Sequence, residues 1–292
     1  NTNHTGFYVA KNKGYYKEAG LDVDIIEPGD NATTSMVAAG KADFGVSYQE
    51  DVTYALTSED PLPIKTIATI IQHNTSGFVS LKSANINSVK DFEGKTYAGW
   101  GAPSEEAVIK AVMNEAGADF SKLNIVGSDG SGIAGLSDEV GKNKVNLGWE
   151  FYGWAIIKAM QDGYDLNYMP LADLDSRLDY YTPVIITNNK MIKKNSDTIQ
   201  KFMEATKKGY EYAIDHPSKA AEILHDDALT DTDLKFLKES QKYLSSQYAK
   251  DADSWGVMKD SVWDNYTDFM YETGLIDHKI DAKDQYTNEF VK

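Results

Sequence analysis

Apolar and polar positions along the chain predict strands and helices in alternation. From residue 7 to residue 19 the apolar spacing is helical, and Gly20 stands where helices commonly end. Residues 21–26 alternate apolar and acidic side chains, as a half-buried strand does. Further strands are expected at 42–46, 64–71, 78–81, 96–100, 123–126, 145–149 and 181–187. This alternation predicts an α/β protein.

The expected helices are short in the first part of the chain and long in the last. Residues 31–39 and 104–116 form short helices that end at Gly40 and Gly117, and Ser104 is the expected N-cap of the second. After residue 188 the pattern is helical almost throughout, at 196–215, 218–225, 231–247 and 259–274. The sheet strands are therefore expected before residue 188.

A weak internal repeat suggests two similar halves. Residues 41–47 read Lys-Ala-Asp-Phe-Gly-Val-Ser and can be laid over residues 144–150, which read Lys-Val-Asn-Leu-Gly-Trp-Glu. The turn at 28–31 then corresponds to 126–129. Such a repeat predicts two α/β lobes. In open α/β sheets, ligands bind outside the carboxyl ends of the strands.

Composition narrows the class of protein. With 292 residues, 41% of them hydrophobic, the chain suits two lobes better than one core. The net charge of −16 would repel nucleic acid and anionic membrane surfaces. The chain has no cysteine, so disulfides and thiolate metal or redox sites are excluded, and this is compatible with export. No apolar run approaches the ~20 residues that span a bilayer. The sequence opens at Asn1-Thr2 without a signal-like segment, so we expect a processed or engineered start.

The basic residues disfavour an anionic solute. Arg177 is the single arginine, and the other basic residues that carry a permanent charge are lysines. Arginine is the usual bidentate partner of carboxylate, sulfonate and phosphate groups. We therefore expect a neutral or cationic solute.

Two blocks of sequence resemble a known family. Residues 1–10, Asn-Thr-Asn-His-Thr-Gly-Phe-Tyr-Val-Ala, are followed by Lys-Gly-Tyr-Tyr-Lys-Glu-Ala-Gly-Leu-Asp-Val at 13–23, and residues 39–47 read Ala-Gly-Lys-Ala-Asp-Phe-Gly-Val-Ser. They closely resemble the thiamine-pyrimidine-precursor binding family, which includes ABC-transporter receptors for hydroxymethylpyrimidine and formylaminopyrimidine compounds. The wider pattern resembles nitrate-, sulfonate- and taurine-binding receptors, and it extends to about residue 274.

The resemblance implies a type II periplasmic-binding fold, with two α/β lobes joined by two hinge crossings near residues 81–83 and 183–186. Lobe one would comprise residues 1–82 and 187–292, and lobe two residues 83–186. The family usually has a further β-strand and an Asp-Trp-like element just before the segment that opens here, and these are expected to complete the pocket.

The function implied by the resemblance is transport. The protein would be a monomeric extracytoplasmic receptor, periplasmic or lipid-anchored, without a cofactor and without enzymatic activity. It would capture a thiamine-related aminopyrimidine between its lobes and hand it to an ABC permease. A receptor for riboflavin or an aliphatic sulfonate is one alternative. A pyrimidine-forming enzyme is another, but the related fungal synthases carry a cysteine cluster that is absent from this sequence.

The strongest candidate contacts lie where strands end in lobe two. Trp149 or Tyr152 would stack on a flat ring, while the Glu150 carboxylate would bond an exocyclic amine and a ring nitrogen. The alternative is that Trp149 is a core side chain and Glu150 a solvated charge. Trp100 and Ser104 at the preceding strand-to-helix turn are further candidates.

The remaining candidates come from loops and from lobe one. They are the amide of Gly132, the hydroxyls of Ser47 and Tyr48, Asn3 and His4 before the first helix, and a stacking Tyr180 before the second crossing. Gly132 belongs to a Gly-x-Gly-x-x-Gly match at 130–135, which we interpret as an amide-rich loop because no acidic residue follows at the spacing of a dinucleotide site. Hydrolase and zinc-site motifs are absent from the sequence.

Overall fold

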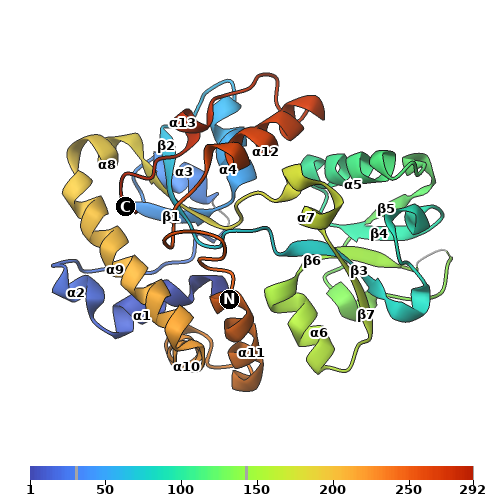
Figure 1. Ribbon diagram of the computed structural model, residues 1–292, viewed down its shortest axis with the longest axis horizontal. Helices are drawn as coiled ribbons and strands as arrows, with labels where there is room; N and C mark the ends of the chain where they lie inside the picture. Colours follow the sequence, from blue (N-terminus) through green and yellow to red (C-terminus); the bar gives the residue numbers. More distant parts are fainter. Residues whose placement is uncertain (30–31, 142–143, 292) are drawn as a thin grey trace. The chain divides into compact units, whose positions relative to one another are not determined.

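A computed structural model describes residues 1–29, 32–141 and 144–291 of the protein (Figure 1). The chain divides into two compact units. Unit 1 comprises Asn1–Asn74, Tyr180–Asp268 and Ile276–Lys292, and unit 2 comprises Thr75–Asp179 and Phe269–Leu275. No helix in the described ranges is both long and apolar enough to cross a bilayer.

The unit boundaries differ from those expected for the lobes, and strand pairing explains the difference. The expected first lobe ran to residue 82, but β3 (Ser76–Leu81) pairs with strands of unit 2 and so belongs there. The expected second lobe ran to residue 186, but β8 (Val184–Asn188) pairs with strands of unit 1. In addition, α12 (Asp260–Glu272) begins in unit 1 and ends in unit 2.

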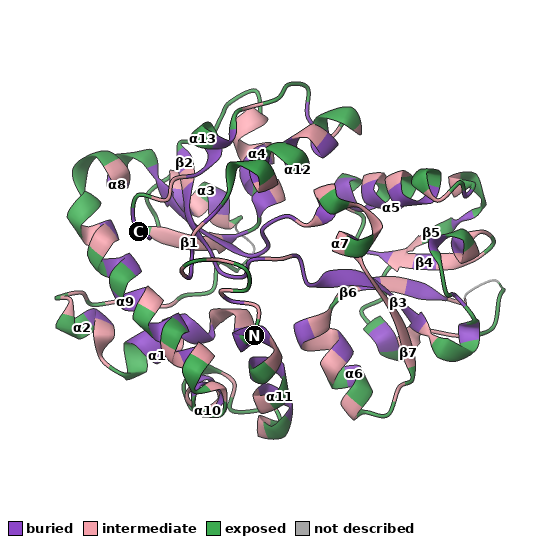
Figure 2. Ribbon diagram, viewed as in Figure 1, coloured by how far each residue is buried: buried purple, intermediate pink, exposed green. Residues whose placement is uncertain are grey.

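Unit 1 contains a three-stranded antiparallel sheet in the order β1-β8-β2, where β1 is Phe44–Ser47 and β2 is Ile64–Thr69. The middle strand, β8, is buried at every residue. The helices of this unit are α1 (Thr5–Asn12), α2 (Tyr15–Glu18), α3 (Thr33–Ala38), α4 (Gln49–Thr57), α8 (Asn189–Lys194), α9 (Ser196–Asp215), α10 (Pro217–Ala228), α11 (Leu234–Ser245), most of α12, and α13 (Ala282–Gln285). Along α9, buried and exposed residues alternate with helical spacing (Figure 2).

Two expectations for the first thirty residues were wrong. The helix expected at 7–19 is two helices, because Gly14 has φ +79° and interrupts the regular hydrogen bonding between α1 and α2. Residues 21–26 form no strand: Leu21, Val23 and Ile25 pack against the core, but no described segment pairs with their backbone. The helix expected at 31–39 is α3 (Thr33–Ala38). Residues 30 and 31, which belong to the expected turn at 28–31, lie outside the described residues.

The contact between α1 and α9 depends on glycine. A Cβ atom on Gly209 would overlap the carbonyl oxygen of Gly6, and one on Gly6 would overlap the Tyr210 ring. We expect Gly209→Ala to lower the free energy of unfolding by about 2 kcal/mol, because displacing backbone costs more than the ~1 kcal/mol that alanine gains over glycine within a helix. Urea denaturation measures this change. Gly127→Ala is the control, since nothing lies within 4 Å of a Cβ there; equal stability of the two variants would contradict the prediction.

Unit 2 contains a five-stranded mixed sheet in the order β5-β4-β6-β3-β7. Its further strands are β4 (Thr96–Gly99), β5 (Asn124–Gly127), β6 (Leu147–Phe151) and β7 (Leu166–Pro170). Strand β4 runs parallel to β5 and β6, and β3 runs antiparallel to β6 and β7. The carboxyl ends of β4, β5, β6 and β7 therefore lie along one edge of the sheet.

Helices cover the two faces of this sheet. On one face Tyr97 of β4 donates a hydrogen bond to Glu105 of α5 (Pro103–Glu115). On the other face Val79 of β3 packs with Ile156, from a π-helical turn at Tyr152–Ile156, and with Ala159 of α6 (Ile157–Gln161). A short helix, α7 (Leu171–Leu174), follows β7. Helix α5 covers one face of β4, while the other face of β4, β5 and β6 lines a pocket.

Candidate functional site

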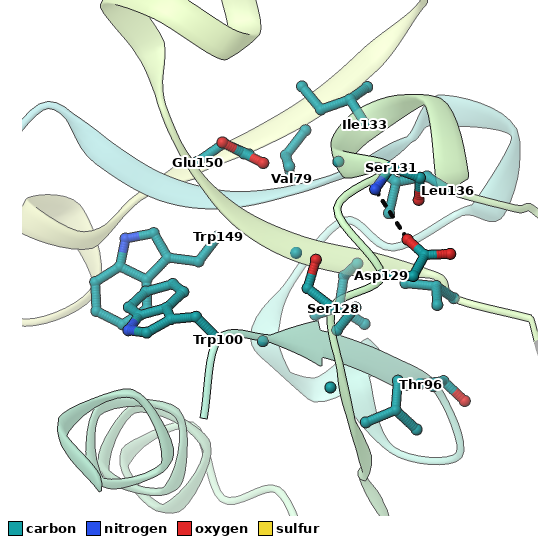
Figure 3. Close-up of a pocket in the computed structure, with 18 of the residues that line it drawn as sticks. Val79, Thr96, Trp100, Ser128, Asp129, Ser131, Ile133, Leu136, Trp149 and Glu150 are labelled. Carbon is teal, nitrogen blue, oxygen red and sulfur yellow. Dashed lines mark hydrogen bonds between the residues drawn. The ribbon is translucent and has the colours of Figure 1, made fainter. Parts of the chain in front are cut away.

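A pocket of about 670 Å³ lies on the face of β4, β5 and β6 that α5 does not cover (Figure 3). This volume is within the range of small-molecule sites. Apolar residues on its walls are Val79, Ala98, Val126, Ile133 and Leu136, and polar ones are Thr96, Asn124, Ser128, Asp129, Ser131 and Glu150. Among the described residues that line it there is no lysine, arginine or histidine. The pocket therefore carries two carboxyl groups and no positive side chain.

The pocket exists because the connection from β5 to β6 is a loop where such crossovers usually carry a helix. Within the described part of this connection the only helical turn is the 3₁₀ turn Gly132–Gly135. Gly130 and Gly132 have φ values of +83° and +55°, in the left-handed region that glycine adopts easily. The loop thus passes over the sheet without filling the space above Ala98 and Val126.

Asp129 orders the start of this loop. Its Oδ1 accepts a hydrogen bond of 2.9 Å from the backbone N–H of Ser131, drawn dashed in Figure 3. Hydrogen bonds from Ser131 lower the pKa of Asp129 below its usual value. Asp129 is therefore ionised at neutral pH.

Glu150 enters the pocket from β6. If Gly132 carried a Cβ, that atom would lie 3.7 Å from Glu150 Oε1, so the carboxyl group lies beneath the loop. Burial raises the pKa of Glu150, because the charged form loses solvation. Within the described part of the chain its carboxyl group forms no hydrogen bond or ion pair. Glu150 is thus a partly buried acid available to a ligand.

Trp149 lies on the opposite face of β6 from Glu150, as neighbouring residues of a strand do. Its ring packs 5.8 Å from Phe78 and 5.1 Å from Trp100, and it is only 8% exposed. Figure 3 shows Trp100 and Trp149 beside each other and apart from Glu150. This placement favours the core role for Trp149. Trp100, at 56% exposed, is an aromatic side chain of this edge that a ligand can reach.

Glu105 holds the loop that carries Trp100, a role that the sequence analysis did not predict. It is 3% exposed and accepts hydrogen bonds from the backbone N–H groups of Trp100 (3.3 Å) and Gly101 (2.9 Å) and from the Tyr97 hydroxyl. A Cβ on Gly99 would overlap its carboxyl group, so a larger residue there would displace that carboxyl group from its donors. This first-turn acid of α5 is therefore a buried structural acceptor.

Asn3 and His4 lie in the 3₁₀ helix Thr2–His4 of unit 1. Burial lowers the pKa of His4 to about 4, so its imidazole is neutral at pH 7. The backbone carbonyl of Asn3 accepts a hydrogen bond of 2.7 Å from Tyr210, while its buried Oδ1 has no hydrogen-bond partner among the described residues. Asn3 therefore has a buried side-chain acceptor that no described residue pairs with.

Ser47, Tyr48 and Tyr180 also belong to unit 1, and they differ in accessibility. Ser47 is buried and donates to Asp51, whereas Tyr48 is 46% exposed. Tyr180 is buried and stacks on Tyr266 with ring centroids 4.0 Å apart. Tyr180 is thus packed within the unit, where its ring stacks on a protein side chain.

Comparison with known proteins identifies the family. Residues 1–220 match the family described as NMT1/THI5 like. The chain belongs to the NMT1/THI5-like family. The formylaminopyrimidine-binding protein of Halalkalibacterium halodurans is 28% identical over 272 residues, which cover 87% of this chain and 79% of that protein.

Other similar proteins include both binding proteins and enzymes. A 4-amino-5-hydroxymethyl-2-methylpyrimidine phosphate synthase of Legionella pneumophila is 24% identical over 100% of this chain and 89% of its own. The riboflavin-binding protein RibY of Chloroflexus aurantiacus is 25% identical over 98% of this chain and 81% of its own. Among solved structures, the alkanesulfonate-binding protein SsuA of Xanthomonas axonopodis pv. citri aligns with a TM-score of 0.72 and 11% identity, covering 98% of this chain and 95% of that one. The periplasmic-binding-protein fold is thereby confirmed, and the chain resembles substrate-binding proteins of this family.

In unit 2 of this NMT1/THI5-like protein, two candidate residues lie away from the pocket walls. Tyr152 packs against Tyr168 at 5.3 Å, within the apolar cluster beside α6. Ser104 is buried in the first turn of α5, and the expectation that it caps this helix was wrong: the N-cap is Ala102, because Pro103 occupies the first helical position. Gly132, Trp100, Trp149 and Glu150 line the pocket.

The single arginine of this NMT1/THI5-like chain does not line the pocket. Arg177 pairs with Asp175 at 2.6 Å and with Glu272 at 2.7 Å, and its guanidinium lies 5.3 Å from the Phe269 ring centroid. The Arg177 guanidinium, the group best suited to bind a sulfonate, is therefore already paired with two acids. Nor does any group of three or more His, Asp or Glu in the described residues form a metal site.

Proposed function

We propose that this protein is the extracytoplasmic solute-binding receptor of an ABC importer and that its solute is a thiamine-related aminopyrimidine. The observation that carries the proposal is Glu150, a partly buried acid with a raised pKa in a pocket whose described walls hold no basic residue. The similarity to a formylaminopyrimidine-binding protein supports it. The partner would be a membrane permease.

The chemistry of recognition follows from the acid. An aminopyrimidine presents an exocyclic N–H donor beside a ring-nitrogen acceptor. A carboxyl group that shares one proton with the ring nitrogen can engage both atoms at once, through two parallel hydrogen bonds. A partly buried acid with a raised pKa suits this pairing, because the shared proton removes the cost of a buried charge. Glu150 would therefore fix both the identity and the orientation of the ring.

Trp100 would provide the second contact. Its exposed indole lies at the end of β4, beside the pocket, and Glu105 fixes the loop that carries it. Stacking of aromatic rings contributes about 1 kcal/mol beyond the burial of area. A ring that is bonded at its edge and stacked on its face would be selected over aliphatic solutes.

We infer that the protein binds its solute without converting it. The sequence lacks the cysteine cluster of the fungal synthases, and the described walls of the pocket hold no histidine or lysine to act as a base or nucleophile. Recovery of unchanged ligand by mass spectrometry after prolonged incubation tests this inference. Formation of a new pyrimidine would instead identify a synthase.

Two other solutes, an aliphatic sulfonate and riboflavin, would need different contacts from those of an aminopyrimidine. An aliphatic sulfonate would need a cationic partner, and Arg177 is engaged by Asp175 and Glu272. Riboflavin is favoured by one observation, the similarity to a riboflavin-binding protein, and it would also suit walls without positive charge. Riboflavin also carries an N–H donor beside a carbonyl acceptor. Only the aminopyrimidine places a basic ring nitrogen beside its N–H donor, and that nitrogen can share the proton of Glu150.

Isothermal titration with a panel of solutes tests the proposal. The protein is first unfolded and refolded to remove carried-over ligand, then titrated with hydroxymethylpyrimidine, its formylamino analogue, thiamine, riboflavin and taurine. We expect sub-micromolar binding, beyond about −8 kcal/mol, of at least one aminopyrimidine and no binding of taurine. Binding of riboflavin or taurine alone would overturn the assignment of the solute.

A further inference from the structure

The pocket is longer than a single ring. Thr96 and Asn124 at the starts of β4 and β5 line it, and so do Trp100 and Ser128 just beyond their ends. Four residue steps at about 3.3 Å each span about 13 Å, whereas one substituted six-membered ring covers about two steps. A ring bonded to Glu150 would therefore leave the part of the pocket over the strand starts unfilled.

The inner part of the pocket suits a second ring. Ala98 and Val126 form its floor, and Ile133 and Leu136 face it from the connecting loop. Beyond this apolar stretch, Asn124 donates to the Thr96 hydroxyl at 3.3 Å, so its end presents groups that can also bond a polar substituent. Apolar walls with a few polar groups at one end are typical of sites that bind heteroaromatic ligands.

The charge of the pocket restricts that second ring further. Asp129 is ionised and exposed at the mouth of the inner part, and the described lining residues include no cation. A phosphate or sulfonate placed here would meet a carboxylate and no basic partner, whereas a cationic ring would be attracted. The inner part thus accepts neutral or positively charged groups.

We propose that the solute of this pocket is an aminopyrimidine joined to a second, uncharged or cationic ring, the chemical class of thiamine itself. The aminopyrimidine edge bonds Glu150, and the second ring lies along Ala98 and Val126 with its charge towards Asp129. This inference rests on the proposed function and narrows its substrate class from a one-ring precursor to a two-ring compound.

Titration with three probes tests the inference: thiamine, hydroxymethylpyrimidine and thiamine monophosphate. We expect thiamine to bind at least tenfold more tightly than hydroxymethylpyrimidine, and thiamine monophosphate to bind at least tenfold more weakly than thiamine. Hydroxymethylpyrimidine binding as tightly as thiamine would overturn the inference and leave the proposed function intact. Failure of all three to bind would overturn both.

Variants of the pocket floor locate the second ring. Val126→Trp fills the inner part and is expected to weaken thiamine binding at least tenfold while changing hydroxymethylpyrimidine binding less than twofold. Ile125→Trp is the matched control, because Ile125 is exposed and does not line the pocket. Asp129→Asn keeps the side-chain volume and is expected to weaken thiamine about fivefold, more so at low salt, with hydroxymethylpyrimidine unchanged. Equal losses for both ligands in Val126→Trp and in Asp129→Asn would contradict the placement.

Discussion

The Glu150→Ala variant is expected to bind an aminopyrimidine about 100-fold more weakly than the unaltered protein. The substitution removes both hydrogen bonds that the carboxyl group offers to the exocyclic amine and the ring nitrogen, each worth about 1.5 kcal/mol where charge is shared. It also leaves the two polar atoms of the ligand buried beside the apolar wall at Val79 and Ile133. Isothermal titration of both proteins with the same ligand measures the ratio of dissociation constants.

The same pairing makes binding depend on pH. Burial raises the pKa of Glu150, but above that pKa, and above that of the ring nitrogen, neither partner holds the shared proton. Forming the complex then takes up one proton, so the dissociation constant should rise about tenfold for each pH unit. Glu150→Gln supplies a donor and an acceptor without a titrating proton, and its dissociation constant should not change with pH.

Glu106→Ala is the matched control for Glu150. Glu106 is an exposed acid of the same unit that lies outside the pocket walls, so its removal changes the net charge by the same amount. We expect its affinity and its pH slope to equal those of the unaltered protein. A Glu150→Ala variant that binds within threefold of the unaltered protein, or a Glu150→Gln variant that keeps the slope, would refute the role given to this acid.

Much of the fold could be predicted because buried positions recur in the sequence as apolar residues at helical or strand spacing. The helix expected at 196–215 is α9 with the same bounds, since its apolar residues follow one helical face without interruption. The expected strands that correspond to β1, β2, β3, β4, β5, β6 and β8 overlap the observed ones. Periodicity reports which side chains are buried, however, and not which backbones pair. Residues 21–26 therefore show the strand pattern without a ladder in the described structure.

Strand β7 and the break in the first helix were missed for local reasons. All five residues of β7 are half-buried, so its segment lacks the contrast between apolar and polar positions that marks a strand. The break at Gly14 depends on one backbone angle, and an isolated glycine within a helical pattern does not by itself reveal whether the helix continues. These features depend on the contacts that a segment makes, which periodicity does not encode.

For the site, the rule that ligands bind at strand ends located the right edge of the sheet but not the direction of each side chain. This rule picked out Trp100, Gly132, Trp149 and Glu150, all of which line the pocket. It grouped Trp149 with Glu150, although adjacent strand residues point to opposite faces, and this alternation was visible in the sequence. The open sheet face beneath the β5–β6 loop was indicated in the sequence only by the glycines at 130 and 132, which have positive φ values.

The loop of Trp100 depends on Glu105, whose importance was hidden because a first-turn acid is usually solvated. Its carboxyl group replaces water for three donors at once: the N–H groups of Trp100 and Gly101 and the hydroxyl of Tyr97. Tyr97 is fully buried, so without Glu105 its hydroxyl has no access to solvent. An unpaired buried hydroxyl alone costs about 1–3 kcal/mol.

We therefore expect Glu105→Ala to lower the free energy of unfolding by about 3 kcal/mol, since it removes the acceptor of three hydrogen bonds and leaves a cavity beneath the start of α5. Urea denaturation followed by tryptophan fluorescence measures this loss, and Trp100, released from its loop, should show a shifted emission before the main transition. Glu106→Ala, one residue along the same turn and exposed, should stay within about 0.5 kcal/mol of the unaltered protein. Equal stability of the two variants would show that the acceptor at Glu105 is dispensable, and Trp100 would then need another support to remain where a ligand can stack on it.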